Sequence, residues 1–143
     1  MPAQENKVLA RYYLEQIFNH KNLAAIEEFV AHNVLDHSLP PGFPAGLAGY
    51  GGRVTELLQA FPDLHLEYQD FTCEADRVLA RYTLSGTHQG EFAGVSATGK
   101  AVQVSGMEML RFKDGKVIER WNELDLLGFF QQLGVISEEL RVG

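Results

Sequence analysis

Hydrophobic side chains in the first part of the chain recur with the period of a helix. This spacing predicts helices over Glu5 to Asn19, Leu23 to Val30 and about Gly49 to Phe61. Val34 to His37 is a short extended piece. The proline- and glycine-rich run Pro40 to Gly46 can be neither a helix nor an inner strand, so a loop is expected there. The amino-terminal part is therefore predicted to be mainly helical.

After Pro62 the hydrophobic period changes to two, which is typical of strands. The predicted strands are Leu64 to Cys73, Val78 to Leu84, Val102 to Phe112 and Val117 to Glu123. The glycine-rich stretch Gly86 to Lys100 is expected to be a long connection, in which Glu91-Phe92 could add a short strand. Lys113-Asp114-Gly115-Lys116 predicts a hairpin turn, and Leu126 to Leu133 a short helix that Gly134 ends.

Helices followed by a run of antiparallel strands predict an α+β fold, with one domain over residues 1–143. The later strands carry hydrophobic side chains on both faces: Val102, Val104, Leu110 and Phe112 on one side, Met107 and Met109 on the other. The helices can cover one face, and the second face then needs a partner subunit or a further helix. We therefore expect a homodimer or larger homo-oligomer through that face. A sheet that curls over the helices would enclose a conical cavity suited to a ligand.

Composition narrows the functional classes. A net charge of −7 argues against a nucleic-acid partner and against anionic membranes, and no apolar run reaches the length of a membrane span. The polar N-terminus lacks an apolar signal core, so a cytoplasmic protein is expected. The single cysteine excludes an internal disulfide, and the five histidines are not spaced as metal ligands. A small-molecule substrate or ligand is the expected partner, without a metal.

Candidate chemistry concentrates at the last strand, where Glu119-Arg120-Trp121-Asn122-Glu123-Leu124-Asp125 holds three of the acids and the only tryptophan. Alternation along a strand would point Glu119, Trp121 and Asp125 the same way. A carboxylate held in an apolar pocket can act as a general acid or base. Asp125 is the candidate for this role, and the alternative is a cap on the following helix. Trp121 is expected to form a pocket wall, and Glu119 could be a second carboxylate.

Further candidates lie elsewhere in the chain. Glu108 interrupts an apolar strand, so it either pairs with an arginine (Arg81 or Arg120) or lines the cavity. His37 precedes the proline-rich loop and could polarise a carbonyl group or orient Asp125, or be a loop histidine.

Several large apolar residues are expected to be core, and a few must line the cavity if it exists. Tyr12, Phe43 and Met107 are candidates for this lining. A cavity lined by aromatic and methionine side chains would suit a flat or aliphatic substrate rather than a sugar or a phosphate.

Several motifs taken together resemble one known family. They are Thr87 to Gly94, Ala97 to Lys100, Arg111 to Trp121, Asp125 and Gln132 to Gly134, with His37 compatible. This set resembles the SnoaL-like polyketide cyclase and ester cyclase family. The resemblance implies a fold like that of nuclear transport factor two, a cone of helices wrapped by a curved antiparallel sheet. It also implies ring closure by intramolecular aldol condensation without a metal or organic cofactor, with Asp125 as the proton shuttle.

Other functions fit the same residues. An isomerase or an epoxide hydrolase would also need a carboxylate in an apolar cavity. An epoxide hydrolase would in addition need a water held by an Asp/Arg/Asn set, which the spacing alone does not assemble. A non-catalytic ligand-binding or assembly module would use the acids only as caps and surface charges.

Overall fold

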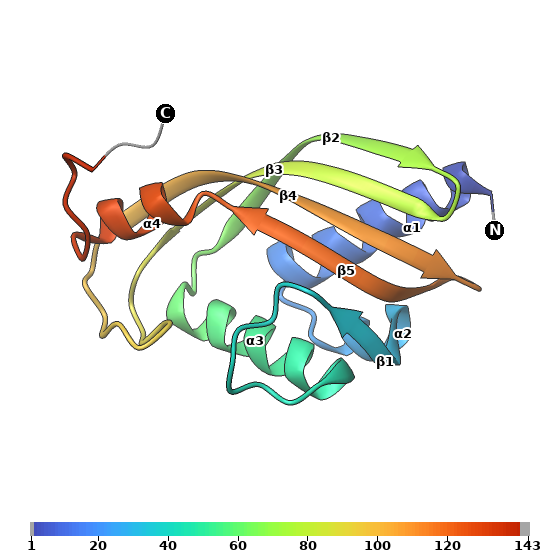
Figure 1. Ribbon diagram of the computed structural model, residues 1–143, viewed down its shortest axis with the longest axis horizontal. Coiled ribbons are helices and arrows are strands. Elements are labelled where there is room, and N and C mark those ends of the chain that lie inside the picture. The colour runs from blue at the N-terminus through green and yellow to red at the C-terminus, as the bar shows by residue number, and fades with distance from the viewer. Residues whose placement is uncertain (1, 141–143) are drawn as a thin grey trace.

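The computed structural model describes residues 2–140 as helices packed on one side of a curved five-stranded sheet (Figure 1). The helical elements are α1 Ala3–Leu14, a π-helical turn η1 Glu15–Asn19, α2 Ala24–Phe29, α3 Gly46–Ala60 and α4 Leu126–Leu133. The strands are β1 Val30–Asp36, β2 His65–Glu74, β3 Arg77–Thr87, β4 Ala101–Lys113 and β5 Lys116–Leu124. The predicted α+β class is confirmed.

The sheet has the strand order β1-β5-β4-β3-β2. Strands β2 to β5 are antiparallel to their neighbours, as expected, whereas β1 joins the edge of β5 in parallel. The sequence predicted only Val34 to His37 as extended and assigned Val30 to a helix. Strand β1 was missed because it has no regular alternation: its buried positions are Val30 and Val34, four residues apart, and its pairing with β5 is irregular.

The first helix ends at Asn19 as predicted, but with an unexpected last turn, and the start of α3 differs from the prediction. The first helix continues to Asn19, but its last turn is π-helical, and there the Asn19 side chain hydrogen-bonds both the N–H and the C=O of Leu66 at 2.8 and 2.9 Å. Helix α3 begins three residues earlier than expected, at Gly46. A side chain at Gly49 would overlap the Pro44 carbonyl, so this glycine lets the proline-rich loop turn directly onto the helix.

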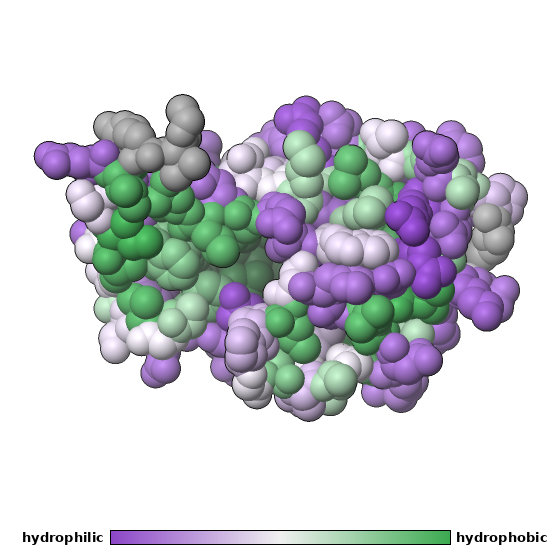
Figure 2. Space-filling model, in the orientation of Figure 1, coloured by the Kyte–Doolittle hydropathy of each residue, from purple (hydrophilic) through white to green (hydrophobic). Residues whose placement is uncertain are grey.

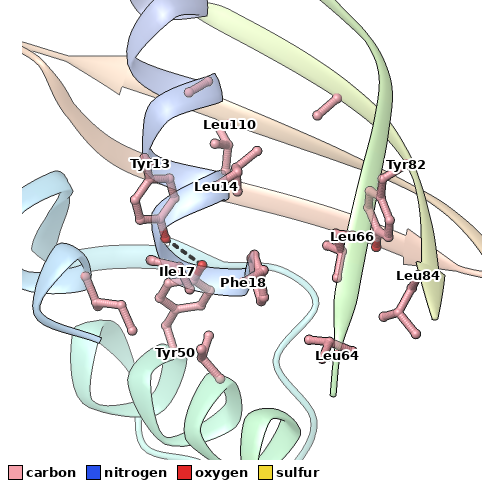
Figure 3. Packing of buried hydrophobic residues seen from close by; sticks show 14 of the residues in the cluster. Tyr13, Leu14, Ile17, Phe18, Tyr50, Leu64, Leu66, Tyr82, Leu84 and Leu110 are labelled. Carbon is pink, nitrogen blue, oxygen red and sulfur yellow. Dashed lines mark hydrogen bonds between the residues drawn. The ribbon is translucent and has the colours of Figure 1, made fainter. Parts of the chain in front are cut away.

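The hydrophobic core lies between the helices and the inner face of the sheet (Figure 3). In that view Leu14 and Phe18 approach the strands from the first helix, and Tyr13 meets Tyr50 of α3 through a 2.5 Å hydrogen bond between their hydroxyls. The inward positions of β3 and β4 alternate as predicted, so Leu110 and its neighbours of the same parity are buried. Each fully buried large side chain contributes about 1.5–3 kcal/mol to folding.

The outer face of the sheet is partly apolar and is not covered by the helices. Leu79 and Met107 are 38% and 48% exposed on it. Helix α4 follows β5 at one end of the sheet, near the C-terminal end of the described chain (Figure 1). Within residues 2–140, no helix is both long and apolar enough to cross a membrane.

Candidate functional site

A cavity of about 170 Å³ lies between α3 and the inner face of the sheet and extends toward α4. Figure 2 shows hydrophobic surface gathered over the α4 end of the molecule, beside a hollow in that face. Apolar side chains that line the cavity include Leu57, Leu66, Leu84, Phe92 and Phe129. Polar side chains that line it include Ser38, Tyr82, Glu108, Arg120 and Asn122. The cavity is therefore apolar with a small set of polar groups, as ligand sites commonly are.

A buried ion-pair triad forms the polar part of this wall. Arg120 on β5 donates from Nε to Glu108 Oε1 at 2.6 Å, and from Nη1 to the two carboxylate oxygens of Asp36 at 3.0 and 3.2 Å. The two acidic side chains are each 2% exposed. The strand register assembles the triad, because Asp36 pairs with Arg120 across the edge of the sheet and Leu110, two residues beyond Glu108, pairs with Arg120 from the other side.

The triad carries one excess negative charge, since two carboxylates share one guanidinium. Burial alone would lower the pKa of Arg120, but the charge of Glu108, with Tyr50 and Asp36, raises that pKa well above its usual range. The guanidinium therefore stays protonated, and it also lies 5.0 Å from the centre of the Tyr50 ring. The surplus carboxylate charge beside the cavity would attract a positively polarised hydrogen of a ligand.

Tyrosine hydroxyls surround the triad. Burial raises the pKa of Tyr50, Tyr68 and Tyr82, and the negative charge of Glu108 raises each of them further. These hydroxyls therefore remain protonated and cannot act as bases at neutral pH, and among the described residues the Tyr68 hydroxyl has no hydrogen-bond partner. Tyr82 donates to Oδ1 of Asn122 at 2.6 Å. That bond fixes the amide orientation, so the Asn122 NH₂ group is the end left for other acceptors.

Close contacts with the backbone hold the hydrogen-bonded pair of Tyr82 and Asn122 in place. Gly106 is the register partner of Tyr82, and a Cβ on it would lie 2.5 Å from the tyrosine hydroxyl and ring. The missing side chain lets the Tyr82 ring cross over β4 and reach Asn122 on β5. On the other side, Ser38 Oγ accepts from the Asn122 backbone N–H at 2.6 Å and donates to its carbonyl at 3.0 Å. The loop after β1 thus fastens Asn122 at the cavity.

The predicted site residues separate into two groups, and Glu108 alone lies on the cavity wall. The two alternatives predicted for Glu108 are both correct, because its side chain pairs with Arg120 and also lines the cavity. Asp125 does not line the cavity, in contrast to the expectation. It is exposed, and its Oδ1 accepts the backbone N–H of Gly128 at 2.9 Å, which is the N-cap geometry of α4.

Glu119, Trp121 and Met107 share one face, as alternation predicted, but this is the outer face of the sheet. Trp121 pairs with Met109 in the register, and both line an outer groove of about 780 Å³ that Met107 and Asp125 also line. His37 stacks on Trp121 at 4.8 Å between ring centres and contacts Glu119 at 2.6 Å. The pKa of Glu119 is lowered, first by the hydrogen bond with His37 and then by that with Arg111. The expected pocket wall is therefore a surface cluster.

The two remaining aromatic candidates also lie away from the cavity wall. Tyr12 is 53% exposed on α1 and packs edge-on against Phe29 at 5.7 Å. Phe43 sits in the proline-rich loop, where the Arg53 guanidinium lies 5.9 Å from its ring centre. Among the described residues, no three histidine, cysteine or acidic side chains are grouped so that they could hold a metal ion.

The sequence reasoning missed three polar residues that line the cavity, Ser38, Tyr82 and Asn122, and it also missed Asp36, which pairs with Arg120. The signal that could have identified one of them is strand parity. Residues of β5 that alternate with Trp121 face inward, so Arg120 and Asn122 share the inner face with Glu108.

Comparison with known proteins identifies the family. The profile of the SnoaL-like polyketide cyclases matches residues 7–133. The chain is 30% identical over 112 residues to the aklanonic acid methyl ester cyclase DauD of Streptomyces sp. (strain C5), covering 76% of this chain and 70% of DauD. The chain therefore belongs to the SnoaL-like polyketide cyclase family, which confirms the resemblance noted in the sequence.

Solved structures show the same fold. AclR of Streptomyces galilaeus, described as a candidate hydroxylase, is 33% identical with a TM-score of 0.82, over 94% of this chain and 99% of AclR. TsrD of Streptomyces laurentii has a TM-score of 0.86 at 23% identity, over 95% of this chain and all of TsrD, which is a likeness of fold. The fold expected from the resemblance, a cone of helices in a curved sheet, is confirmed.

Proposed function

We propose that this protein is a cyclase-type enzyme that performs cofactor-free acid–base chemistry on a small carbonyl compound inside the cavity. Family membership supports a cyclase, and the relative DauD acts, by its description, on a methyl ester. One observation carries the proposal beyond the family: Glu108 and Arg120, which form a buried triad with Asp36, line a largely apolar cavity. Burying such a group without a use would be costly.

Glu108 is the proposed base. Arg120 holds its Oε1, whereas its Oε2 accepts no hydrogen bond from the described residues. In the proposed reaction, Oε2 takes a proton from the carbon next to a carbonyl group, and the electron pair of that C–H bond forms an enolate. The Asn122 NH₂ group, oriented by Tyr82, donates to the enolate oxygen.

Ring closure then follows within the same molecule. The enolate carbon forms a C–C bond to a second carbonyl carbon, whose π electrons move onto its oxygen. This alkoxide takes back the proton held by Glu108, so the base is restored and the product is a β-hydroxy carbonyl compound. The apolar walls, such as Leu57 and Phe129, exclude water that would otherwise protonate the enolate.

A matched pair of variants tests Glu108 against the earlier candidate, Asp125. The assay follows deuterium incorporation next to the carbonyl, by NMR in D₂O, across a panel of ketones and keto esters containing one to three rings. Glu108→Gln keeps the shape and removes the base, so exchange should fall by about 10²–10⁴-fold. Asp125→Asn keeps the helix cap, because asparagine caps as well as aspartate, and should retain exchange.

A loss of exchange in Asp125→Asn, but not in Glu108→Gln, would place the base on the outer face of the sheet. If Glu108→Gln stays within about tenfold of the native rate while Asp125→Asn loses it, the assignment of the base is wrong. If the compounds bind but neither the native chain nor any variant exchanges protons, the protein is a binding module.

Hydrolysis of an epoxide is a second candidate, because the structure brings together the Asp/Arg/Asn set that the spacing alone did not assemble. Asp36 and Arg120 are in contact, and Asn122 is two residues along the same strand on the same face. A water held at this set would attack an epoxide carbon while Glu108 takes the water proton. The C–O bond of that carbon would break, its electron pair would move onto the epoxide oxygen, and this alkoxide would take the proton from Glu108 to give the diol. Incubation of small epoxides in ¹⁸O water, with diol formation as the readout, tests this reaction.

The expected homodimer and cytoplasmic location remain predictions. The outer sheet face, with Leu79 and Met107 exposed beside Trp121, is where the homodimer is proposed to form.

A further inference from the structure

The size of the cavity limits what it can hold. Its volume is about 170 Å³. Pockets for drug-sized ligands are usually about 300–1,000 Å³, whereas an engineered cavity of about 150 Å³ in another protein binds benzene. The described cavity therefore has room for one ring and a short substituent.

The polar and apolar parts of the cavity are separated along the strands. Tyr82 and Leu84 are consecutive inward positions on β3, which places their Cα atoms about 7 Å apart. The tyrosine lies at the end that holds Glu108 and Asn122, and the leucine continues toward α4. A ligand whose oxygen atoms lie at the triad would thus have space for about one apolar ring between the triad and the α4 end of the cavity.

Three aromatic rings pack together at that end. Phe92 and Phe129 meet edge to face with 5.7 Å between ring centres, and both lie 5.7 Å from Phe61. All three are buried, with Phe61 and Phe129 fully inaccessible. Because each ring is held by the other two, the end of the cavity is a packed wall rather than a loose side chain that could swing aside.

The segment that carries Phe92 is itself fastened to α3. The Arg53 guanidinium lies 4.4 Å from the centre of the Phe92 ring, and Glu56 Oε1 accepts the backbone N–H of Ala93 at 3.0 Å. Phe92 also exchanges two backbone hydrogen bonds with Val95. These contacts hold the end wall in place.

We propose that this site selects carbonyl compounds no larger than one ring with a short substituent, and that Phe92 sets this limit. The proposal rests on the proposed function only in taking the ligand to be a carbonyl compound. It opposes the usual trend, in which a larger apolar ligand binds more tightly because it buries more surface. The order of affinities across ring sizes is therefore diagnostic.

Calorimetric titration of the full chain tests the proposal with the neutral ketones cyclohexanone, 1-indanone and anthrone, which have one, two and three rings. The one-ring compound should bind, the two-ring compound should bind roughly tenfold more weakly, and the three-ring compound should not bind inside. Phe92→Ala should strengthen binding of the two-ring compound by roughly tenfold, because it adds the volume of a ring.

Two variants keep the test decisive if Phe92→Ala does not fold. Leu57→Phe fills the cavity from α3 and should abolish binding of the one-ring compound, whereas Leu79→Ala, on the outer face, should leave it unchanged. The proposal is overturned if the native chain binds the three-ring compound as tightly as the one-ring compound, or does not bind the latter at all.

Failure of the size limit can be told apart from failure of the proposed chemistry. Glu108→Gln changes no residue of the end wall, so the order of affinities should survive in it even where proton exchange is lost. Undiminished exchange in Glu108→Gln would refute the chemistry and leave the size order standing.

Discussion

Replacement of Arg120 by methionine probes the buried triad most directly. Methionine keeps much of the length and volume of the side chain but removes the charge and the three hydrogen bonds to Glu108 and Asp36. Both carboxylates, each 2% exposed, then lack their cation. Removing one partner of a buried ion pair costs about 3–5 kcal/mol. For a chain of this size, that loss should lower the melting temperature by roughly 10–15 °C.

The pH dependence gives a second signature. In Arg120→Met the folded state must bind protons to keep Asp36 and Glu108 buried, whereas the unfolded state leaves them ionised at neutral pH. The folded state then binds more protons than the unfolded state, so stability rises as the pH falls. The slope should approach about 1.4 kcal/mol per pH unit for each extra proton. Urea unfolding followed by circular dichroism between neutral pH and pH 5 measures it.

Arg111→Met is the matched control, because Arg111 also pairs with a glutamate but on the surface. Its loss should be much smaller, since exposed ion pairs contribute little. The reasoning is refuted if Arg120→Met is no less stable than this control, or if acidification does not restore stability.

A triple variant separates stability from function in the same triad. Replacement of Asp36 and Glu108 by leucine together with Arg120→Met removes every buried charge of the triad. Such apolar replacements are often neutral or stabilising. The triple variant should therefore recover most of the lost stability and still show no proton exchange, as expected if the triad is retained for chemistry.

Three further predictions concern other parts of the molecule. Gly106→Ala should displace the Tyr82 ring and destabilise the protein by about 1–3 kcal/mol in urea unfolding, and an unchanged midpoint would contradict the close approach. His37→Ala should raise the pKa of Glu119 toward its ordinary value, which NMR titration of the carboxyl carbon measures. In the native chain, the stability from this contact is present at neutral pH and is lost as the pH falls, and the variant should lack this loss. Met107→Glu should shift a homodimer to monomer in light scattering, and a native monomer would refute the proposed assembly.

Much of the sheet could be predicted because its later strands alternate regularly and two of their three connections are tight turns. The Lys113–Lys116 turn sets the register of β4 against β5, and alternation then shows which residues share a face. Alternation does not show which face is covered. Both faces of β5 carry polar side chains: Glu119 lies beside Trp121 on one face, and Arg120 and Asn122 lie on the other. The acidic and aromatic side was taken for the pocket, and the structure assigns the pocket to the opposite parity.

The amino acid sequence by itself determined the α+β class, the family and the antiparallel run of strands, because these depend on local periodicity and on motifs close together in the chain. Only the tertiary structure decided where the chemistry can occur. Strand β1 pairs in parallel with β5 from a distant part of the chain, and this pairing brings Asp36 to Arg120. Charge compensation at the cavity therefore depends on residues from three strands, and no local pattern in the sequence reveals it.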